Sequence, residues 1–215
     1  MTSARRSAIT ALLCRAFVLA CTSAGGATAQ GPTQLTVPRG FQVSVFADSV
    51  RNARSMALGP LGTLFVGSQY AGQVYAIVDR NNDRKADRVI VIAKGLNQPN
   101  GVAMRNGALY VATANQLLRF DDIERRLDSP PAPVVVRDNL PNPREGHTWK
   151  FIAFGPDDLL YMSVGSTCNV CEPAPMTAAI VRMKPDGSNL EVFADGIRNS
   201  VGFDWHPTTH ELWFT

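Results

Sequence analysis

One segment decides the fold: Phe151-Ile152-Ala153-Phe154-Gly155-Pro156-Asp157-Asp158-Leu159-Leu160-Tyr161-Met162. Its apolar ends and its Gly-Pro-Asp centre are typical of two short strands joined by a tight turn. Related segments begin at Ser55, Gly101 and Val201, so the four copies start 46, 50 and 50 residues apart (55 to 101, 101 to 151, 151 to 201). That period is the span of one four-stranded blade of a β-propeller.

Further short apolar runs between the copies supply the other strands of each blade. They are predicted at 73–78, 89–93, 117–120, 134–137, 179–183 and 190–193, with a short helix at 123–127. The sequence therefore predicts an all-β protein, a β-propeller of four-stranded antiparallel blades. A β-sandwich is the competing architecture, but a sandwich needs no internal repeat. About three and a half blades are present, and since propellers have four to eight, we expect a piece of a longer protein.

The N-terminus is predicted to be an export signal covering residues 1–29, followed by a partial propeller over 30–215. Arg5 and Arg6 form a positive start, 9–20 is mostly apolar, and Ala27-Thr28-Ala29 is a small-residue cleavage pattern. The apolar stretch is too short to cross a bilayer permanently, so no transmembrane span is expected in the mature chain. A periplasmic or secreted protein follows, with lipoprotein anchoring through Cys21 as the alternative.

Charge and cysteine content narrow the class further. The net charge of +3 falls to about zero once the three arginines of the signal are removed (+3 minus 3), which gives no electrostatic support for a nucleic-acid partner. Cys168 and Cys171 are the two cysteines of the mature part. In an oxidising compartment they favour a disulfide over free thiols, and a zinc site would need two further ligands nearby.

Three segments resemble the PQQ-dependent glucose/sorbosone dehydrogenase family. They are Leu140–Lys150, which contains Glu145-Gly146-His147; Gly196-Ile197-Arg198-Asn199-Ser200-Val201-Gly202-Phe203; and Leu96–Ala103, which contains Asn97-Gln98-Pro99-Asn100. The insertion Cys168-x-x-Cys171 is more similar to the L-sorbosone branch. The resemblance covers 35–215 and implies a propeller that has six blades when complete.

The resemblance implies a quinoprotein oxidoreductase that oxidises an aldose or a sorbosone-like sugar with hydride transfer to PQQ. His147 would be the base, because an imidazole can take a hydroxyl proton near neutral pH. Arg198 would stabilise negative charge on the quinone. The remaining implied contacts to the cofactor are Asn199, Asn100, Trp149 and Lys150. Glu145 would orient His147, although the family places an acidic residue where this chain has Gly146.

The family's calcium ion, bound to the cofactor, is expected to use ligands beyond Thr215. A separate calcium hypothesis concerns the hairpin that follows the first copy of the repeat. Asp79, Asn81, Asp83 and Asp87 place oxygen side chains at positions 1, 3, 5 and 9 of a calcium-loop pattern. Arg84 replaces the usual glycine, so a solvated hairpin tip is the favoured interpretation.

Two other functions share the predicted fold. A lactonase-type hydrolase would hold a catalytic calcium and needs an acidic residue at the entry of the first blade, where this chain has Arg54-Ser55-Met56. An NHL-like propeller would bind partners without catalysis. For a dehydrogenase, the expected partners are a small sugar and an electron acceptor of the cytochrome or quinone type.

Overall fold

The computed structural model describes residues 35–143 and 145–215, in a chain that divides into two compact units, 1–44 and 45–215. The predicted signal and Cys21 lie outside the described residues. In the first unit, residues 35–44 are exposed coil, and the Phe41 amide donates a hydrogen bond to the Pro38 carbonyl at 3.1 Å.

The second unit is built from antiparallel sheets that follow one another along the chain. Three sheets have four strands, in the orders β1-β2-β3-β4, β5-β6-β7-β8 and β12-β11-β10-β9, and a fourth pairs β13 with β14. The strands are β1 (Ala53–Leu58), β2 (Leu64–Ser68), β3 (Val74–Val78), β4 (Arg88–Ala93), β5 (Gly101–Arg105), β6 (Ala108–Ala112), β7 (Leu117–Phe120), β8 (Val134–Arg137), β9 (Ile152–Phe154), β10 (Leu160–Val164), β11 (Ala179–Met183), β12 (Glu191–Ala194), β13 (Phe203–Trp205) and β14 (Leu212–Phe214). The predicted all-β propeller of four-stranded antiparallel blades is confirmed.

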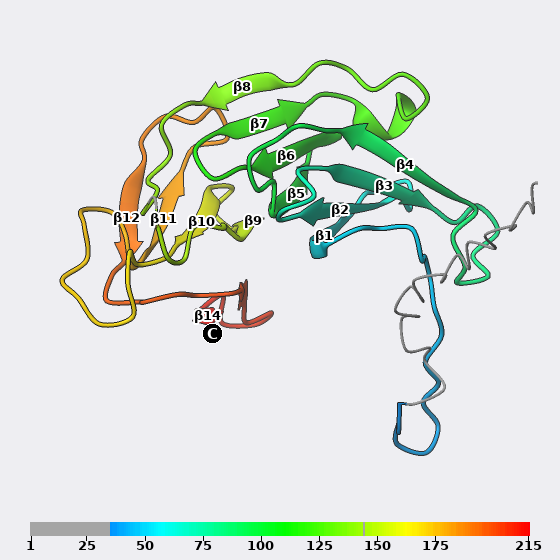
Figure 1. Ribbon diagram of the computed structural model, residues 1–215, viewed down its shortest axis with the longest axis horizontal. Coiled ribbons are helices and arrows are strands. Elements are labelled where there is room, and N and C mark those ends of the chain that lie inside the picture. Colours follow the sequence, from blue (N-terminus) through cyan, green and yellow to red (C-terminus); the bar gives the residue numbers. More distant parts are fainter. Residues whose placement is uncertain (1–34, 144) are drawn as a thin grey trace, which may run out of the picture. The chain divides into compact units, whose positions relative to one another are not determined.

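Within this unit the sheets are arranged around an arc, as Figure 1 shows. The first strand of each full sheet, β1, β5 and β9, lies on the inner side of the arc, and the last strand, β4, β8 and β12, lies on the outer side. Strand β1 packs beside β5, and β5 beside β9. Because every sheet starts on the inner side, the segments that enter the sheets come together at one end of the inner strands.

Apolar side chains fill the space between neighbouring sheets. Successive residues of a strand point to opposite faces, and β6 uses both: Leu109 and Val111 pack against the first sheet, whereas Tyr110 and Ala112 pack against the third. Each fully buried side chain of this kind contributes on the order of 2 kcal/mol. The sheets are therefore held to one another by side chains and not by shared strand pairing.

The three full sheets also share an irregularity of strand pairing, a register shift between their two outer strands. The two outer strands of each full sheet shift register at an equivalent place, between Val74 and Tyr75, between Leu117 and Leu118, and between Ile180 and Val181. A bulge adds twist to the outer strand pair. The predicted helix at 123–127 is the short 3₁₀ helix η2 (Ile123–Arg125), whose Glu124 carboxylate accepts hydrogen bonds from the β1–β2 turn.

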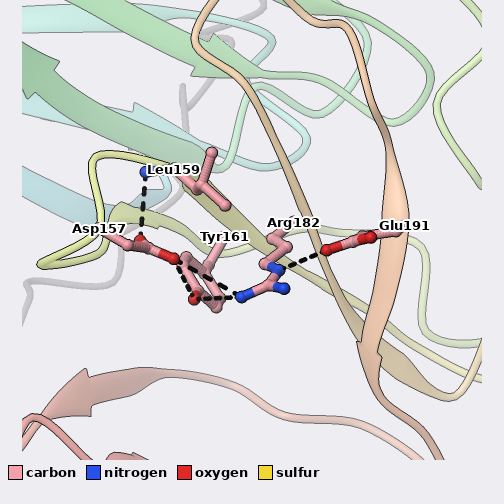
Figure 2. A network of polar contacts seen from close by, with 5 residues as sticks. All are labelled: Asp157, Leu159, Tyr161, Arg182 and Glu191. Carbon is pink, nitrogen blue, oxygen red and sulfur yellow. Dashed lines mark hydrogen bonds and ion pairs between the residues drawn. The ribbon is translucent and has the colours of Figure 1, made fainter.

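A polar network crosses the third sheet at its β9–β10 turn (Figure 2). The Tyr161 hydroxyl donates to Asp157 Oδ2 at 2.9 Å and accepts from Arg182 Nη1 at 3.4 Å, while Arg182 Nε donates to Glu191 Oε1 at 2.7 Å. Burial raises the pKa of the Tyr161 hydroxyl. The network ties β10, β11 and β12 together at the end of the sheet opposite the entry segment. Among the described residues, no helix has the length and apolar character needed to cross a membrane.

Candidate functional site

The segments that enter successive sheets are hydrogen-bonded to the sheet before them. The Ser68 amide, at the end of β2, donates to the Pro99 carbonyl at 3.0 Å. The Ser166 amide, just after β10, donates to the Arg198 carbonyl at 2.8 Å. These bonds bring the segments that hold Asn100 and Arg198 to the same end of the sheets.

Asn100 links the first three entry segments. Its side chain is 3% exposed, and its amide nitrogen donates to the Lys150 carbonyl at 2.7 Å and to Ser55 Oγ at 3.2 Å. Its amide oxygen accepts from Arg54 Nε at 3.4 Å. The buried amide thus fixes β1, β5 and β9 relative to one another at the site.

A cavity of about 460 Å³ opens at this end of the inner strands. Its lining residues are Ala53, Arg54, Ser55, Met56, Asn100, Trp149, Phe151 and Val201. The Arg54 guanidinium lies over the Trp149 ring, 5.2 Å from the ring centroid. A cation held against an aromatic face beside a buried amide gives the cavity a positive, hydrogen-bonding wall.

Lys150, next to the lining residue Trp149 in the sequence, is a buried charged residue. Its side chain is 1% exposed, and its Nζ atom has no hydrogen-bond partner among the described residues. Burial lowers the pKa of this ammonium from 10.5 to about 8 because removal from water disfavours the charged form. The indole Nε1 of the adjacent Trp149 is buried without a partner as well. Unsatisfied buried donors of this kind call for an explanation.

His147 lies on the loop that leads into the third sheet and is partly buried. Its amide donates to the Ser166 carbonyl at 3.2 Å, and its Nε2 lies 3.2 Å from Asn169 Oδ1. Its ring meets the Trp149 ring edge to face, with the centroids 6.4 Å apart. His147 therefore contacts both a lining residue of the cavity and the loop after β10.

Glycines allow the close approach of this histidine to the neighbouring loop. Gly146 has a φ of +72°, and a Cβ there would lie 2.6 Å from the Thr167 carbonyl oxygen. A Cβ at Gly165 would collide with the Cβ and carbonyl oxygen of His147. This explains why the position before His147 carries no carboxylate. Glu145 is exposed, and the ring contact is made by Asn169 instead.

Arg198 is exposed and lines a second cavity, of about 270 Å³, with Ser166, Asn169, Val170, Cys171, Pro173, Ala178 and Gly196. Asn199 is partly buried beside it. The backbone connects Arg198 to His147, because Ser166 bonds to both residues. The two predicted catalytic residues thus lie at the same end of the sheets, with Asn169 adjoining both the His147 ring and the Arg198 cavity.

The predicted Cys168–Cys171 disulfide is present, with the two Cα atoms 6.0 Å apart. It closes the start of the long loop between β10 and β11. Because Asn169 and Val170 lie between the two cysteines, the disulfide holds a short loop against the second cavity.

The hairpin after β3 is organised by hydrogen bonds to its own backbone. Its amides donate to the carboxylates of Asp79, Asp83 and Asp87, and Asn81 Oδ1 accepts from the Asp83 amide at 3.0 Å. Within the part of the chain that the structure describes, no three His, Cys, Asp or Glu side chains gather as a metal site. The geometry is that of a hydrogen-bonded hairpin tip, and calcium binding by this loop stays a prediction.

The structure brings Asn100, Trp149 and Lys150 to one region and places His147 between it and the Arg198 cavity. Sequence reasoning missed Arg54, because one arginine at the start of a repeated segment carries no motif. Its stacking on Trp149 and its bond to Asn100 appear only once β1 and β5 are adjacent. Asn169 was missed because its contact with His147 forms only where the loop after β10 approaches the loop before β9.

Sheets of four antiparallel strands that follow one another around an arc are the blades of a β-propeller, and solved structures share this architecture. The holo PQQ domain of pyranose dehydrogenase from Coprinopsis cinerea is similar in structure, with a TM-score of 0.67 at 16% identity, over 79% of this chain and 45% of that one. PQQ-bound aldose sugar dehydrogenase from Streptomyces coelicolor gives 0.59 at 21% identity, over 79% and 57%. A candidate gluconolactonase gives 0.59 at 15% identity, over 82% and 60%.

A family model described as TrAA12-like matches residues 35–215, and the chain belongs to that family. The resemblance to PQQ-dependent sugar dehydrogenases is thereby confirmed. An uncharacterized protein of Borreliella burgdorferi is 26% identical over 191 residues, which is 84% of this chain and 48% of that protein. The chain thus spans about half the length of the curated relative it matches.

Proposed function

We propose that this chain carries the cofactor-facing half of a PQQ-dependent oxidoreductase that oxidises an aldose or a sorbosone-like sugar. The observation that carries the proposal is the set of donors at the entry end of the sheets: Arg54, Asn100 and Lys150 in one region, with His147 and Arg198 beside it. A base and several cations at one end of a propeller suit the oxidation of an alcohol by an anionic acceptor.

The residues present fit the expected cofactor. PQQ is an ortho-quinone that carries carboxylates, so it needs cations and hydrogen-bond donors around it. Lys150 Nζ is buried without a partner, which is costly unless a bound anion completes its coordination. The Arg54 guanidinium lies over the Trp149 ring and lines the cavity, and it carries N–H donors suited to a carboxylate. Arg54 would hold one carboxylate at the cavity, where Asn100 keeps it in place. The Lys150 side chain does not line the cavity, and its role toward a second carboxylate is carried over from the family pattern.

In the proposed sugar oxidation, each side chain of the site has a separate role. When bound, the quinone supplies the carbonyl group that accepts hydride. His147 accepts the proton of the sugar hydroxyl at a ring nitrogen as the C–H bond breaks. Arg198 would supply a positive charge beside the quinone oxygen, and Asn199 would supply a hydrogen-bond donor next to it. Each role is assigned by position in the family pattern and is supported by the shared location at the entry end.

The proposed reaction also needs a calcium ion and an electron acceptor. We place the calcium ion against the bound cofactor, with ligands beyond Thr215. A cytochrome or a quinone would reoxidise the cofactor.

Export is the second part of the proposal: cleavage after Ala29 would release the mature protein, and Cys21 offers lipoprotein anchoring as the alternative. N-terminal sequencing of the exported protein distinguishes the two, because a lipid-modified Cys21 would itself be the first residue.

The dehydrogenase hypothesis is favoured over the lactonase type by the first entry segment. A catalytic calcium site needs a carboxylate there, whereas β1 presents Arg54 at the cavity, and a cation repels calcium. An NHL-like binding role is less consistent with the buried, unpartnered Lys150, because a purely structural propeller gains nothing from a costly buried charge.

We expect this chain alone to be inactive, so the test is dye reduction by the full-length protein that contains it, supplied with PQQ and calcium, with aldoses and sorbosone-like sugars as substrates. His147→Ala should lose roughly two to four orders of magnitude in rate, as expected for removal of a general base. Arg198→Ala should weaken cofactor binding as well as rate. His206→Ala is the matched control, because His206 Nδ1 accepts amide hydrogen bonds within an exposed turn. Full activity in His147→Ala, or no cofactor binding by the parent protein, would refute the proposal.

A further inference from the structure

One ring contact of His147 is not explained by the family pattern. Its Nε2 lies 3.2 Å from Oδ1 of Asn169, and Asn169 is one of the two residues enclosed by the Cys168–Cys171 disulfide. A histidine on the loop before β9 is therefore held by a residue of the loop after β10.

The loop that carries Asn169 is fixed at both ends. The Cys168 amide donates to Ser166 Oγ at 3.4 Å, and Thr167 Oγ1 lies 3.4 Å from Cys171 Sγ. The disulfide then joins the two cysteines covalently. Asn169 is exposed, so no core packing fixes its side chain. The short covalent ring limits how far the segment that carries Asn169 can move.

The same loop also fixes the backbone of His147. The Ser166 carbonyl accepts the His147 amide, and the Ser166 amide donates to the Arg198 carbonyl. One loop therefore contacts the backbone of His147, the ring of His147 and the backbone of Arg198. Such a shared support is what a base and a cation acting on one substrate need.

We propose that Asn169 is a positioning residue for His147 and that the Cys168–Cys171 disulfide holds Asn169 in place to do so. Asn169 Oδ1 can only accept, so His147 Nε2 donates the proton of this bond and Nδ1 is left as the ring nitrogen that can act as the base. The amide carries no charge, so it restrains the ring while favouring its protonated form less than a carboxylate in its place would. This inference rests on the proposed function of His147 as the base.

The contact is tested first without cofactor or substrate, by NMR titration of the histidine ring in the intact protein. Asn169→Asp puts a carboxylate at the observed contact. It should move the titration curve of His147 to higher pH by on the order of 0.5 to 1 pH unit, the effect of one charge near 4 Å in a solvated site. His206 and His210 are internal references within this chain, and their curves should not move.

Two control variants separate a specific contact from added charge. Val170 is 95% exposed and is the other residue between the cysteines, so Val170→Asp adds the same charge to the same loop without the contact. It should move the His147 curve by less than about 0.3 pH unit. In the Cys168→Ser, Cys171→Ser background, Asn169→Asp should lose most of its effect. Equal shifts from both aspartates, or a full shift in the open loop, would overturn the proposal.

An activity measurement then connects the contact to catalysis. With cofactor and sugar, Asn169→Ala should lower kcat roughly 5- to 50-fold with little change in KM, because the ring is restrained less well. Asn169→Asp should move the acidic limb of the pH–rate profile in the direction of its NMR shift. Unchanged kcat and pH profile in an active enzyme would refute the positioning role. An inactive parent enzyme with the predicted NMR shifts would refute the dehydrogenase function and leave the contact established.

Discussion

Lys150→Met tests whether the buried ammonium is kept for binding at the expense of stability. The difference between a pKa of 10.5 in the unfolded chain and about 8 in the folded protein corresponds to about 3 kcal/mol against folding at pH 7. Methionine keeps the length and shape of the side chain and has no charge to desolvate. The variant should therefore be more stable than the parent without cofactor, by up to about 3 kcal/mol.

The stability cost of the buried Lys150 ammonium depends on pH. Between pH 8 and pH 10.5 the unfolded chain binds more protons than the folded protein at Lys150, so parent stability rises with pH in that window. The advantage of Lys150→Met should then fall to roughly half by pH 9.5. Urea denaturation of both proteins at pH 7 and pH 9.5 measures it.

Cofactor titration is the second arm of this experiment. Lys150→Met should bind PQQ at least 10-fold more weakly, because a partner for a carboxylate is lost. Lys150→Arg is the control that keeps the charge and changes its shape. A variant that is less stable at both pH values and binds PQQ as tightly as the parent would show that the lysine is structural.

Three further predictions follow from other contacts. Gly165→Ala should cost about 2 to 4 kcal/mol in urea denaturation, because its Cβ would meet the backbone of the proposed base, whereas Gly202→Ala, with open space around it, should cost under about 1 kcal/mol. Arg182→Ala should cost about 1 to 2 kcal/mol, since it breaks the network of Figure 2, and leave dye reduction unchanged, so lost activity in a folded protein would contradict it. Mass spectrometry without reductant should find Cys168 and Cys171 resistant to alkylation, and the double serine variant should lose about 2 kcal/mol or less because the closed loop is short.

The repeat made the fold predictable because each copy is the same hairpin in the same environment. The strands expected at 117–120, 134–137 and 179–183 were found at those residues, whereas the strand expected at 190–193 is Glu191–Ala194. That strand is an outer one with exposed residues, so its side-chain pattern gives little indication of where pairing starts.

The site was predictable only where its residues belong to a family pattern or to an equivalent position of the repeat. Asn100 and His147 precede repeated segments, and the structure places both at the entry end. The environment of Lys150 was not predictable, since lysines are rarely buried and no charged partner in the sequence indicates burial here. The contact between Asn169 and His147 depends on how two loops approach each other, which no local pattern specifies.

The loop after β10, residues 165–178, lies between strands and can change without changing the pairing of the strands. The apolar faces that hold neighbouring sheets together lie on the strands, whereas residues 165–178 lie outside them and still reach both the base and the arginine cavity. Changes near the start of this loop should therefore alter the surroundings of His147 and Arg198 while the apolar contacts between the sheets persist, whereas Met176 packs against the core and should be kept. A graft of the disulfide loop into another propeller of the class would transfer the support of the base as one unit.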